Sequence, residues 1–346
     1  MNILHLHTEL NITCGISKTI FLIAKYPKDG DMHYVLAFGG DAGKKYSGSG
    51  INVVFLKRRR SFFKDFLYLK KFVKKNEIDI IHSHHRYWDF VADSASRFFG
   101  AKRITSVQSF VYGKKLMSYK SPVLLAAGES VKKHLVDYFG VNKKRIVVFN
   151  NFTDESEIKA VRQKQEVRTE LDIPDDAYVF GYAGRFSVKE KGIDVLADAF
   201  RDFSGKYSGA RLVMAGGGSD IKKILIPENT LILDSKENIF DYYNIFDCFI
   251  LPSRVDPFPL ACLEAGMMKI PFIGSDVNGI PEMIENNKDG LLFPKEISLM
   301  LSEKMEVFYK DRKFAGECSR RFFDKVKEKY NSTKALDKLN RIYRNL

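Results

Sequence analysis

Short apolar segments alternate with amphipathic segments along the whole chain. The apolar runs are bounded by turn residues, and the segments between them have helical spacing. Parallel strands covered by helices on both faces have this pattern. We therefore predict an α/β fold with strands at residues 3–6, 34–38, 53–56, 78–81, 103–107, 123–127 and 146–149, and then at 178–182, 211–215, 230–233, 247–251, 271–274 and 291–293.

A polar stretch separates these two series of strands. It runs from Asn150 to Asp176 and contains few apolar residues. Composition of this kind marks a domain boundary, and 346 residues suffice for two domains. We expect domains at 1–155 and 156–329, followed by a helical C-terminus.

Two carboxylates follow the strand expected at 247–251. Asp256 lies in the strand-to-helix loop, and Glu264 lies eight residues later on a helix that Pro259 opens. Eight residues at ~100° each return a side chain to within roughly 80° of its starting direction, so both carboxylates can face one cleft. The free amides of the first helical turn would form an anion site there. An ordinary loop Asp and helix Glu remain the alternative.

This segment resembles the E-x7-E signature of family 4 retaining glycosyltransferases. Besides Asp256 and Glu264, the matching positions are Pro252, Ser253, Phe258, Leu260 and Leu263. The resemblance implies that Asp256 contacts the transferred sugar, that Glu264 holds the nucleotide ribose, and that Phe258 belongs to the donor site. Asp replaces Glu at the first position, and Pro257 and Pro259 replace glycines. Since Pro259 has no N–H, the donor diphosphate would need the amides of Leu260 and Ala261.

A basic loop after the strand at 178–182 is similar to the family's G-R-L-x-x-x-K-G segment. Arg185 and Lys191 fall on the positions that bind the donor diphosphate, with Lys189 as the rival of Lys191. Cations suit this place because negative charge builds on the departing diphosphate. A solvated basic loop is the alternative.

Two glycine-containing turns accompany these motifs. Residues 274–282 are similar to the family's S-D-x-G-G-x-P-E turn, with Asn278 in place of its first glycine. Asn tolerates positive φ, so we expect the turn to form. The run Gly216-Gly-Gly218 is not a dinucleotide fingerprint, and we expect a tight turn near the donor site.

Histidines end the strand expected at 78–81. The pattern around His82 and His84 resembles the family's D-h-h-H-x-H, which implies that His84 lies beside the reacting sugar. A structural role for the histidines and a metal site of His82, His84 and His85 are the alternatives. Near the N-terminus, the loop 12–17 corresponds to the family's Gly-Gly loop at the donor phosphate, with only Gly15 retained.

The resemblance implies the GT-B fold, in which two Rossmann-like, doubly wound domains face a central cleft and a C-terminal helix at 330–346 completes the first. The second domain would bind a nucleotide diphosphate sugar, and the first a saccharide or lipid-linked acceptor in surface polysaccharide or glycolipid synthesis. We expect no cofactor and no divalent metal, because Arg185 and Lys191 would supply the positive charge. A sugar-nucleotide epimerase of the same fold is the alternative enzyme.

The net charge of +13 is confined to the first half. Residues 1–150 hold 26 Lys and Arg against 11 Asp and Glu, and the remainder holds 30 against 32. This asymmetry favours an anionic partner such as a membrane surface. A nucleic-acid-binding protein is the alternative of another class, but we find no binding module and expect no nucleic acid.

Residues 57–75 form an amphipathic segment in this basic half. Phe62, Phe66, Leu69 and Val73 share one face, Lys64, Lys71 and Lys75 lie on another, and Arg58, Arg59 and Arg60 precede them. The segment either covers the sheet or docks on an anionic membrane.

No signal peptide and no run of roughly 20 apolar residues is found in the sequence. Four separated cysteines without a C-x-x-C pair indicate reduced thiols. We expect a cytoplasmic protein, peripheral at the inner face of the membrane.

Overall fold

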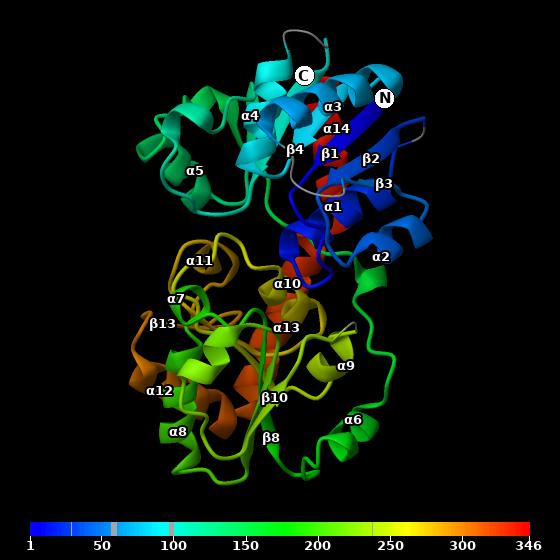
Figure 1. Ribbon diagram of the computed structural model, residues 1–346. Helices are drawn as coiled ribbons and strands as arrows, with labels where there is room; N and C mark the ends of the chain where they lie inside the picture. The colour runs from blue at the N-terminus through cyan, green and yellow to red at the C-terminus, as the bar shows by residue number, and fades with distance from the viewer. Residues whose placement is uncertain (29, 57–60, 97–99, 237) are drawn as a thin grey trace. The chain divides into compact units, whose positions relative to one another are not determined.

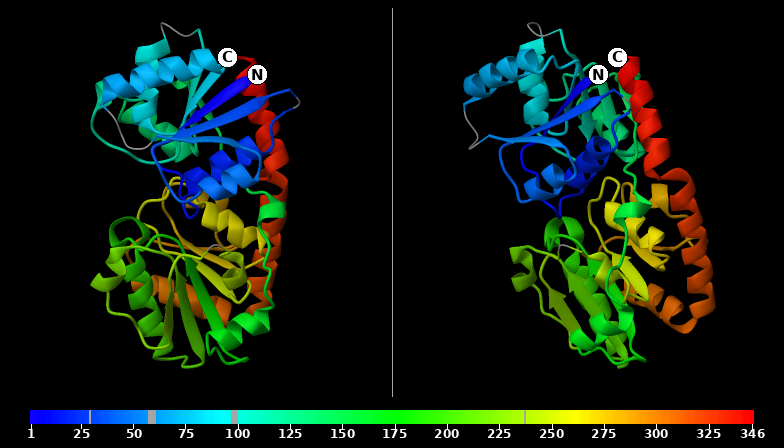
Figure 2. Two further views of the ribbon diagram at one scale, coloured as in Figure 1. Left: turned by 45° about the vertical axis from the view of Figure 1, so that its right-hand side comes forward. Right: turned by 90° about the vertical axis from the view of Figure 1, so that its right-hand side faces the viewer.

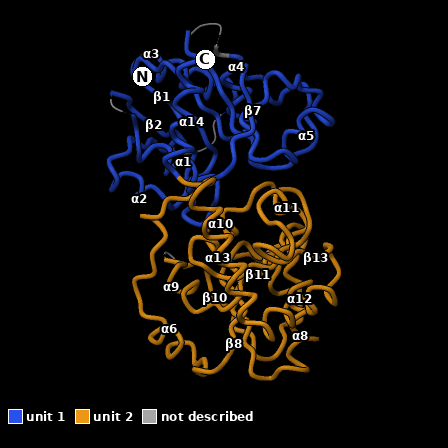
Figure 3. Tube along the Cα trace, turned by 180° about the vertical axis from the view of Figure 1, so that it is seen from behind, with its two compact units in different colours: residues 1–151, 332–346 blue, residues 152–331 orange. Residues whose placement is uncertain are grey.

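The computed structural model describes every residue of the chain except 29, 57–60, 97–99 and 237. The chain divides into two compact units (Figures 1 and 3). The first comprises residues 1–151 and 332–346, and the second residues 152–331. Each is a parallel sheet with helices on its faces, so the predicted fold class is confirmed. No helix among the described residues is long and apolar enough to cross a bilayer.

The first unit contains a seven-stranded sheet in the order β3-β2-β1-β4-β5-β6-β7. Its strands are β1 Asn2–Leu6, β2 Met32–Ala37, β3 Asn52–Phe55, β4 Ile80–Ser83, β5 Lys102–Val107, β6 Val123–Ala126 and β7 Ile146–Val148. Its helices are α1 Gly15–Lys25, α2 Gly43–Gly48, α3 Phe62–Lys75, α4 Arg86–Ser96, α5 Glu129–Asp137 and α14 Ser332–Arg344, with short 3-10 turns at Lys115–Met117 and Lys143–Arg145.

The second unit contains a six-stranded sheet in the order β10-β9-β8-β11-β12-β13. Its strands are β8 Tyr178–Ala183, β9 Ala210–Ala215, β10 Thr230–Leu233, β11 Cys248–Leu251, β12 Phe272–Ser275 and β13 Leu291–Phe293. Its helices are α6 Lys164–Glu170, α7 Val188–Lys191, α8 Ile193–Ser204, α9 Phe240–Tyr243, α10 Leu260–Met267, α11 Ile280–Met283, α12 Ser298–Lys310 and α13 Arg312–Lys329, with 3-10 turns at Glu155–Glu157 and Ser219–Lys223.

The predicted strands are all present, and only β4 lies clearly off its prediction of 78–81. Ile78 is buried and apolar like a strand residue, but its amide donates to the carbonyl of Val73 at the end of α3. It therefore closes the turn after the helix, and the strand begins at Ile80. This shift places His82 within the strand and His84 directly after it.

The two faces of the first sheet differ in chemistry. Leu4, Leu6 and Ile81 share one apolar face, which packs against Leu69 of α3 and Trp88 of α4. The apolar face predicted for residues 57–75 therefore covers the sheet.

The other face carries a row of histidines. His5 of β1 is in register with His82 of β4, and His33 of β2 is in register with Ile3, so all three side chains share this face. His84 follows two residues after His82 on the same side.

The C-terminal helix α14 lies against this histidine face (Figures 1 and 2). The hydroxyl of Tyr343 lies 2.6 Å from His82 Nδ1, and Ser106 Oγ lies 2.7 Å from His82 Nε2. Lys338 Nζ donates to the carbonyl of Val148 at 2.8 Å. The last residues of the chain thus complete the first unit and supply a partner for a buried imidazole.

Burial keeps these histidines uncharged. Loss of hydration lowers the pKa of His7 and His33 to about 4 and that of His82 to about 3. It also holds the pKa of His5 and His84 well below the usual range. The first unit therefore folds around neutral imidazoles.

We expect acid to destabilise the first unit through these rings. Their folded-state pKa values lie below the ordinary value of 6.5, so below that pH the unfolded chain binds protons that the folded chain excludes. The free energy of unfolding should fall, by up to about 1.4 kcal/mol per pH unit for each histidine, from about pH 6.5 down to about pH 4. Urea denaturation followed by fluorescence of Trp88, the one tryptophan of the chain, measures this.

The His7→Asn variant is the matched test, because it removes one buried, titrating ring, that of the residue just after β1. Its unfolding free energy should depend on pH less steeply than that of the natural protein. The difference should be the contribution of one histidine, up to about 1.4 kcal/mol per pH unit. A denaturation midpoint that does not change between about pH 7.5 and about pH 5 would contradict the prediction.

Candidate functional site

The predicted donor residues follow two adjacent strands of the second sheet. The chain runs outward from β8 to β9 and β10, then returns to place β11 on the other side of β8. Loops leaving the carboxyl ends of β8 and β11 therefore diverge, and such a switch point is where open α/β sheets bind ligands. Arg185 and Lys191 follow β8, whereas Asp256 and Glu264 follow β11.

An ion pair joins the two loops at this point. Lys191 Nζ lies 2.5 Å from Asp256 Oδ2, and Ser253 Oγ donates to the same oxygen at 3.1 Å. The Asp256 side chain is 5% exposed and that of Lys191 is 21% exposed. A half-buried ammonium thus lies beside a buried carboxylate, and the structure selects Lys191 rather than Lys189 as the partner of Asp256.

The loop after β8 is shaped by close packing. Ser187 Oγ accepts from the Glu190 amide at 3.2 Å and caps α7, which carries Lys191. Gly192 ends this helix with φ 62°, and a Cβ there would lie 2.2 Å from the carbonyl oxygen of Pro252. Only glycine satisfies both conditions, so Gly192 fixes the approach of α7 to the loop after β11.

The glycine run 216–218 packs against the same loop. A Cβ on Gly216 would lie 1.8 Å from the carbonyl oxygen of Gly184, and the Phe186 amide donates to the carbonyl of Gly217 at 2.7 Å. The run has no regular secondary structure and leads into the 3-10 turn at Ser219–Lys223, so the tight turn expected from the sequence stays a prediction. The run supports the backbone on which Arg185 is placed.

Arg254 links the loop after β11 to α7 and α8, and it was not singled out from the sequence. Its guanidinium donates to both carboxylate oxygens of Asp194 on α8, at 2.7 and 2.9 Å, and to the carbonyl of Val188 at 2.5 Å. Its backbone amide donates to the carbonyl of Glu190 at 2.8 Å. The loop after β11 is therefore bound along α7. The sequence did offer one signal for this role, since Arg254 is a charged residue two positions before Asp256 in the same segment.

Glu264 lies on α10, which begins after Pro259 as predicted. Its side chain is buried, and the hydroxyl of Tyr243 on α9 donates to Oε2 at 3.3 Å. Burial, reinforced by the Glu264 carboxylate, holds the pKa of Tyr243 well above its usual range. Tyr243 was also missed, because α9 carries no motif that connects it with Glu264.

The start of α10 has no side-chain cap. Pro259 occupies the N-cap position and makes no capping hydrogen bond. Leu260 and Ala261 therefore begin the helix with the amides that the sequence assigned to the diphosphate. Phe258 is buried with its ring 5.4 Å from that of Tyr330, so only its backbone is placed to meet a ligand.

The turn at Asn278 holds the backbone of Asp256 through two hydrogen bonds. Asn278 has φ 48°, as expected for the residue that replaces glycine. Its side-chain oxygen accepts from the Asp256 amide at 3.2 Å, and the Gly279 amide donates to the Asp256 carbonyl at 3.1 Å. Both backbone polar groups of Asp256 are thereby held.

Arg185 is not part of the Lys191–Asp256 pair. Its side chain is 62% exposed and forms an ion pair with Glu190 on α7. An exposed guanidinium on a supported loop remains available to an anionic ligand.

The first unit places its predicted residues at the corresponding switch point. Strands β1 and β4 are adjacent, Gly15 begins α1 after β1, and His84 follows β4 directly. His84 Nε2 lies 3.1 Å from His5 Nδ1, and His84 Nδ1 is buried without a hydrogen-bond partner among the described residues. Where the chain is described, the histidines with metal-ligand spacing are His5, His82 and His84. His85 is not in this group, so the metal alternative was wrong in its third residue.

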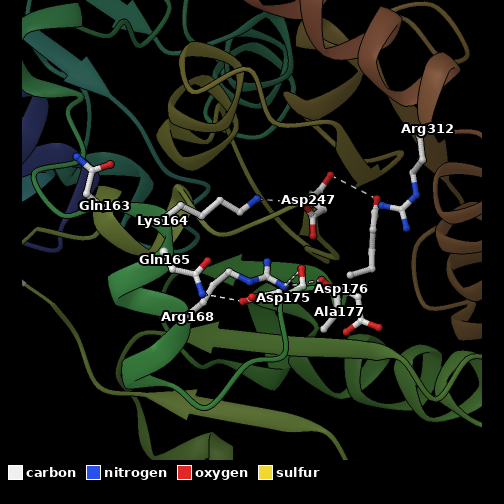
Figure 4. Close-up of a pocket in the computed structure, with 10 residues that line it drawn as sticks. Gln163, Lys164, Gln165, Arg168, Asp175, Asp176, Ala177, Asp247 and Arg312 are labelled. Atoms are coloured by element: carbon white, nitrogen blue, oxygen red, sulfur yellow. Dashed lines mark hydrogen bonds and ion pairs between the residues drawn. The ribbon is translucent and has the colours of Figure 1, made fainter.

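The second unit also has a hollow of about 490 Å³, at the end of the sheet opposite the switch point (Figure 4). Tyr178 at the start of β8 and Asp247 just before β11 line it, so it opens at the amino ends of the strands. Two contacts join residues of its wall, an ion pair of Lys164 with Asp247 at 3.4 Å and a hydrogen bond of Gln165 with Asp175 at 2.7 Å. The hollow therefore lies at the opposite end of these strands from the switch point.

Comparison with known proteins covers both units. Residues 163–323 match the family model "Glycosyl transferases group 1", and residues 15–157 match "Glycosyltransferase Family 4". The capsular polysaccharide biosynthesis glycosyltransferase CapM of Staphylococcus aureus is 22% identical over 91% of this chain and 90% of its own length. The UDP-Gal:alpha-D-GlcNAc-diphosphoundecaprenol alpha-1,3-galactosyltransferase of Escherichia coli is 23% identical over 81% of this chain and 79% of its own.

Solved structures give the same fold. Anabaena Alr3699/HepE in complex with UDP-glucose superposes with a TM-score of 0.89 at 15% identity, over the full length of both chains. The chain has two parallel-sheet units of the GT-B type, and one family model matches each half of it. The chain therefore belongs to the family 4, group 1 glycosyltransferases.

Proposed function

We propose that this glycosyltransferase is a retaining enzyme that transfers a sugar from a nucleotide diphosphate sugar to a saccharide or lipid-linked acceptor, in surface polysaccharide or glycolipid synthesis. The observation that carries the proposal is the Lys191–Asp256 pair at the β8–β11 switch point, with Glu264 buried on the helix that follows. The names of the relatives, which include a capsular polysaccharide enzyme and a galactosyltransferase acting on a diphosphoundecaprenol-linked sugar, support the acceptor class.

Each residue has a role that its surroundings support. Glu264 binds the ribose hydroxyls, because a buried carboxylate can accept hydrogen bonds from two neighbouring hydroxyls. The uncapped amides of Leu260 and Ala261 bind the diphosphate with Arg185 and Lys191. Asp256 faces the transferred sugar. When the diphosphate arrives, Lys191 exchanges a carboxylate partner for a phosphate and stabilises the charge that develops as the sugar leaves.

One prediction of this proposal separates the roles of the two carboxylates. Glu264→Gln should weaken binding of a free nucleoside diphosphate by about 10- to 100-fold, since it removes hydrogen bonds to a charged acceptor. Asp256→Asn should leave this affinity within a few-fold of natural and mainly lower turnover, because the sugar is absent from the ligand. Titration calorimetry measures both affinities.

Asp198→Asn is the control, an identical change in an exposed carboxylate of α8. It should alter neither binding nor turnover. Equal losses of nucleotide affinity in the Asp256 and Glu264 variants would contradict the division of roles.

We also propose that no divalent metal takes part, since Arg185 and Lys191 supply the positive charge. Activity should therefore survive EDTA, and Arg185→Ala should lose on the order of 10² in rate, the effect of removing one electrostatic stabiliser. Arg201→Ala, an exposed arginine of α8, is the matched control. Loss of activity in EDTA with full recovery in Mg²⁺ or Mn²⁺ would overturn this part of the proposal. Nucleotide released without any acceptor would favour the epimerase.

A membrane surface is a second proposed partner of the first unit. The apolar face of α3 is used by the core, but Phe63 and Leu67 are 63% and 46% exposed on another face. At helical spacing they align with Lys70 and Lys74, so apolar and basic groups share one exposed strip. Arg58, Arg59 and Arg60, which the sequence assigned to the same contact, lie outside the described residues.

This strip should bind anionic vesicles weakly and reversibly. Each basic residue near such a surface contributes about 1 kcal/mol, and binding should fade as salt shortens the Debye length from ~10 Å at 0.1 M to ~3 Å at 1 M. Replacing Lys70 and Lys74 by Ser should reduce vesicle sedimentation, whereas the same change at Lys313 and Lys329 of the second unit should not. Equal sedimentation of both variants would contradict the proposal.

A further inference from the structure

Three histidines of the first unit form a continuous hydrogen-bonded chain. His33 Nδ1 lies 2.9 Å from His5 Nε2, and His5 Nδ1 lies 3.1 Å from His84 Nε2. All three rings are buried, and burial lowers the pKa of each. A neutral imidazole has one N–H and one lone pair, so the role of one nitrogen dictates the role of the other.

Only two arrangements satisfy both hydrogen bonds. In one, His84 Nε2–H donates to His5 Nδ1 and His5 Nε2–H donates to His33 Nδ1, which leaves His84 Nδ1 as a bare lone pair and puts a hydrogen on His33 Nε2. In the other, every donor and acceptor is exchanged, and His84 Nδ1 carries the hydrogen. Whether His84 Nδ1 carries a hydrogen therefore depends on whether His33 Nε2 carries one: one of these two nitrogens is protonated and the other is not.

A carboxylate at the His33 end favours the first arrangement. Asp31 lies two residues before His33, on the same side of the extended chain. Its Oδ1 accepts from the Met1 amino group at 2.7 Å, whereas Oδ2 and His33 Nε2 are both buried without hydrogen-bond partners among the described residues. The Asp31 charge raises the pKa of His33 against burial, and the opposing effect of the Met1 ammonium is smaller. The negative charge thus attracts the hydrogen to His33 Nε2.

We propose that Asp31, His33 and His5 are positioning residues that hold His84 in the Nε2–H tautomer, so that His84 Nδ1 accepts a hydrogen bond from a substrate hydroxyl. The acceptor atom is the buried, unpartnered Nδ1 that follows the carboxyl end of β4. Its ligand class is a sugar hydroxyl, and this second half rests on the proposed transferase function. The tautomer itself does not.

A metal ion is the competing occupant of this cluster. One nitrogen from each of His5, His82 and His84 lies within 4.8 Å of the others. However, the facing nitrogens of His5 and His84 already share a hydrogen bond, and both nitrogens of His82 have partners in Tyr343 and Ser106. A cation would break these bonds in a buried site whose three ligands carry no negative charge. The hydrogen-bonded chain accounts for the contacts without that cost.

Nitrogen-15 NMR of the full chain labelled at histidine tests the tautomer directly, because protonated and bare ring nitrogens have separate shifts. His134 provides an internal reference, since its Nε2 lies 2.8 Å from the carbonyl of Val111, which can only accept. His84 should show the same Nε2–H pattern. Asp31→Asn and His33→Phe should each shift His84 toward a mixture of tautomers, and Ser106→Ala, which removes a hydroxyl bonded to His82, should not.

The Asp31→Asn variant keeps the test valid if His33→Phe fails to fold, with Trp88 fluorescence as the check on folding. A His84 that carries its hydrogen on Nδ1 in the natural protein would overturn the proposal. So would one equivalent of Zn²⁺ that shifts the His5, His82 and His84 signals together. For activity, Asp31→Asn should lower kcat about tenfold, the size of one ordinary hydrogen bond, with KM for the donor unchanged. The expected spectra with an unchanged kcat would overturn the contact with substrate and leave the tautomer assignment standing.

Discussion

The ion pair between Lys191 and Asp256 is the contact on which the second unit's site depends. Its two residues leave adjacent strands on opposite sides of a switch point, where nothing in the sheet itself holds the loops together. Gly192, Arg254 and Asn278 are arranged around the pair: one permits the close approach, one binds the loop after β11 along α7, and one holds the Asp256 backbone. A carboxylate, a cation and uncapped helix amides are thereby brought together before any ligand arrives.

A different constraint governs the first unit, where polar rings are buried within a sheet. An unpaired imidazole in a core is costly, so the rings pair with each other and with Tyr343 from the last helix. The result is a row of neutral histidines whose donors and acceptors are interdependent. In both units the predicted site residues thus lie at the switch point and contact buried polar groups.

Much of the fold and part of the candidate site could be predicted from the sequence. Thirteen strands, the parallel sheets and the turn at Asn278 follow from apolar runs and turn residues, because those local patterns directly reflect burial and backbone geometry. The E-x7-E segment pointed to Asp256 and Glu264 through its resemblance to the family signature, and the structure places Asp256 in the loop and Glu264 about one turn into α10.

The remaining features depend on contacts between distant parts of the chain. Arg254 with Asp194, Tyr243 with Glu264, and Tyr343 with His82 are separated by 60, 21 and 261 residues, and no local pattern connects them. His5 fell within a predicted strand and His33 just before one, and neither was linked with His84, because only the strand order β2-β1-β4 brings them beside it. Ile78 misled the prediction of β4 since a buried turn residue and a strand residue are equally apolar.

We expect the donor to bind where Lys191 meets Asp256. Hydrogen–deuterium exchange of the full chain, with and without a panel of UDP, GDP and ADP sugars, tests it most directly. The ligand that binds should slow exchange in residues 184–192 and 253–264, around the β8–β11 switch point, and should leave residues 163–178, at the amino ends of the strands, unchanged. Protection confined to residues 163–178 would contradict it.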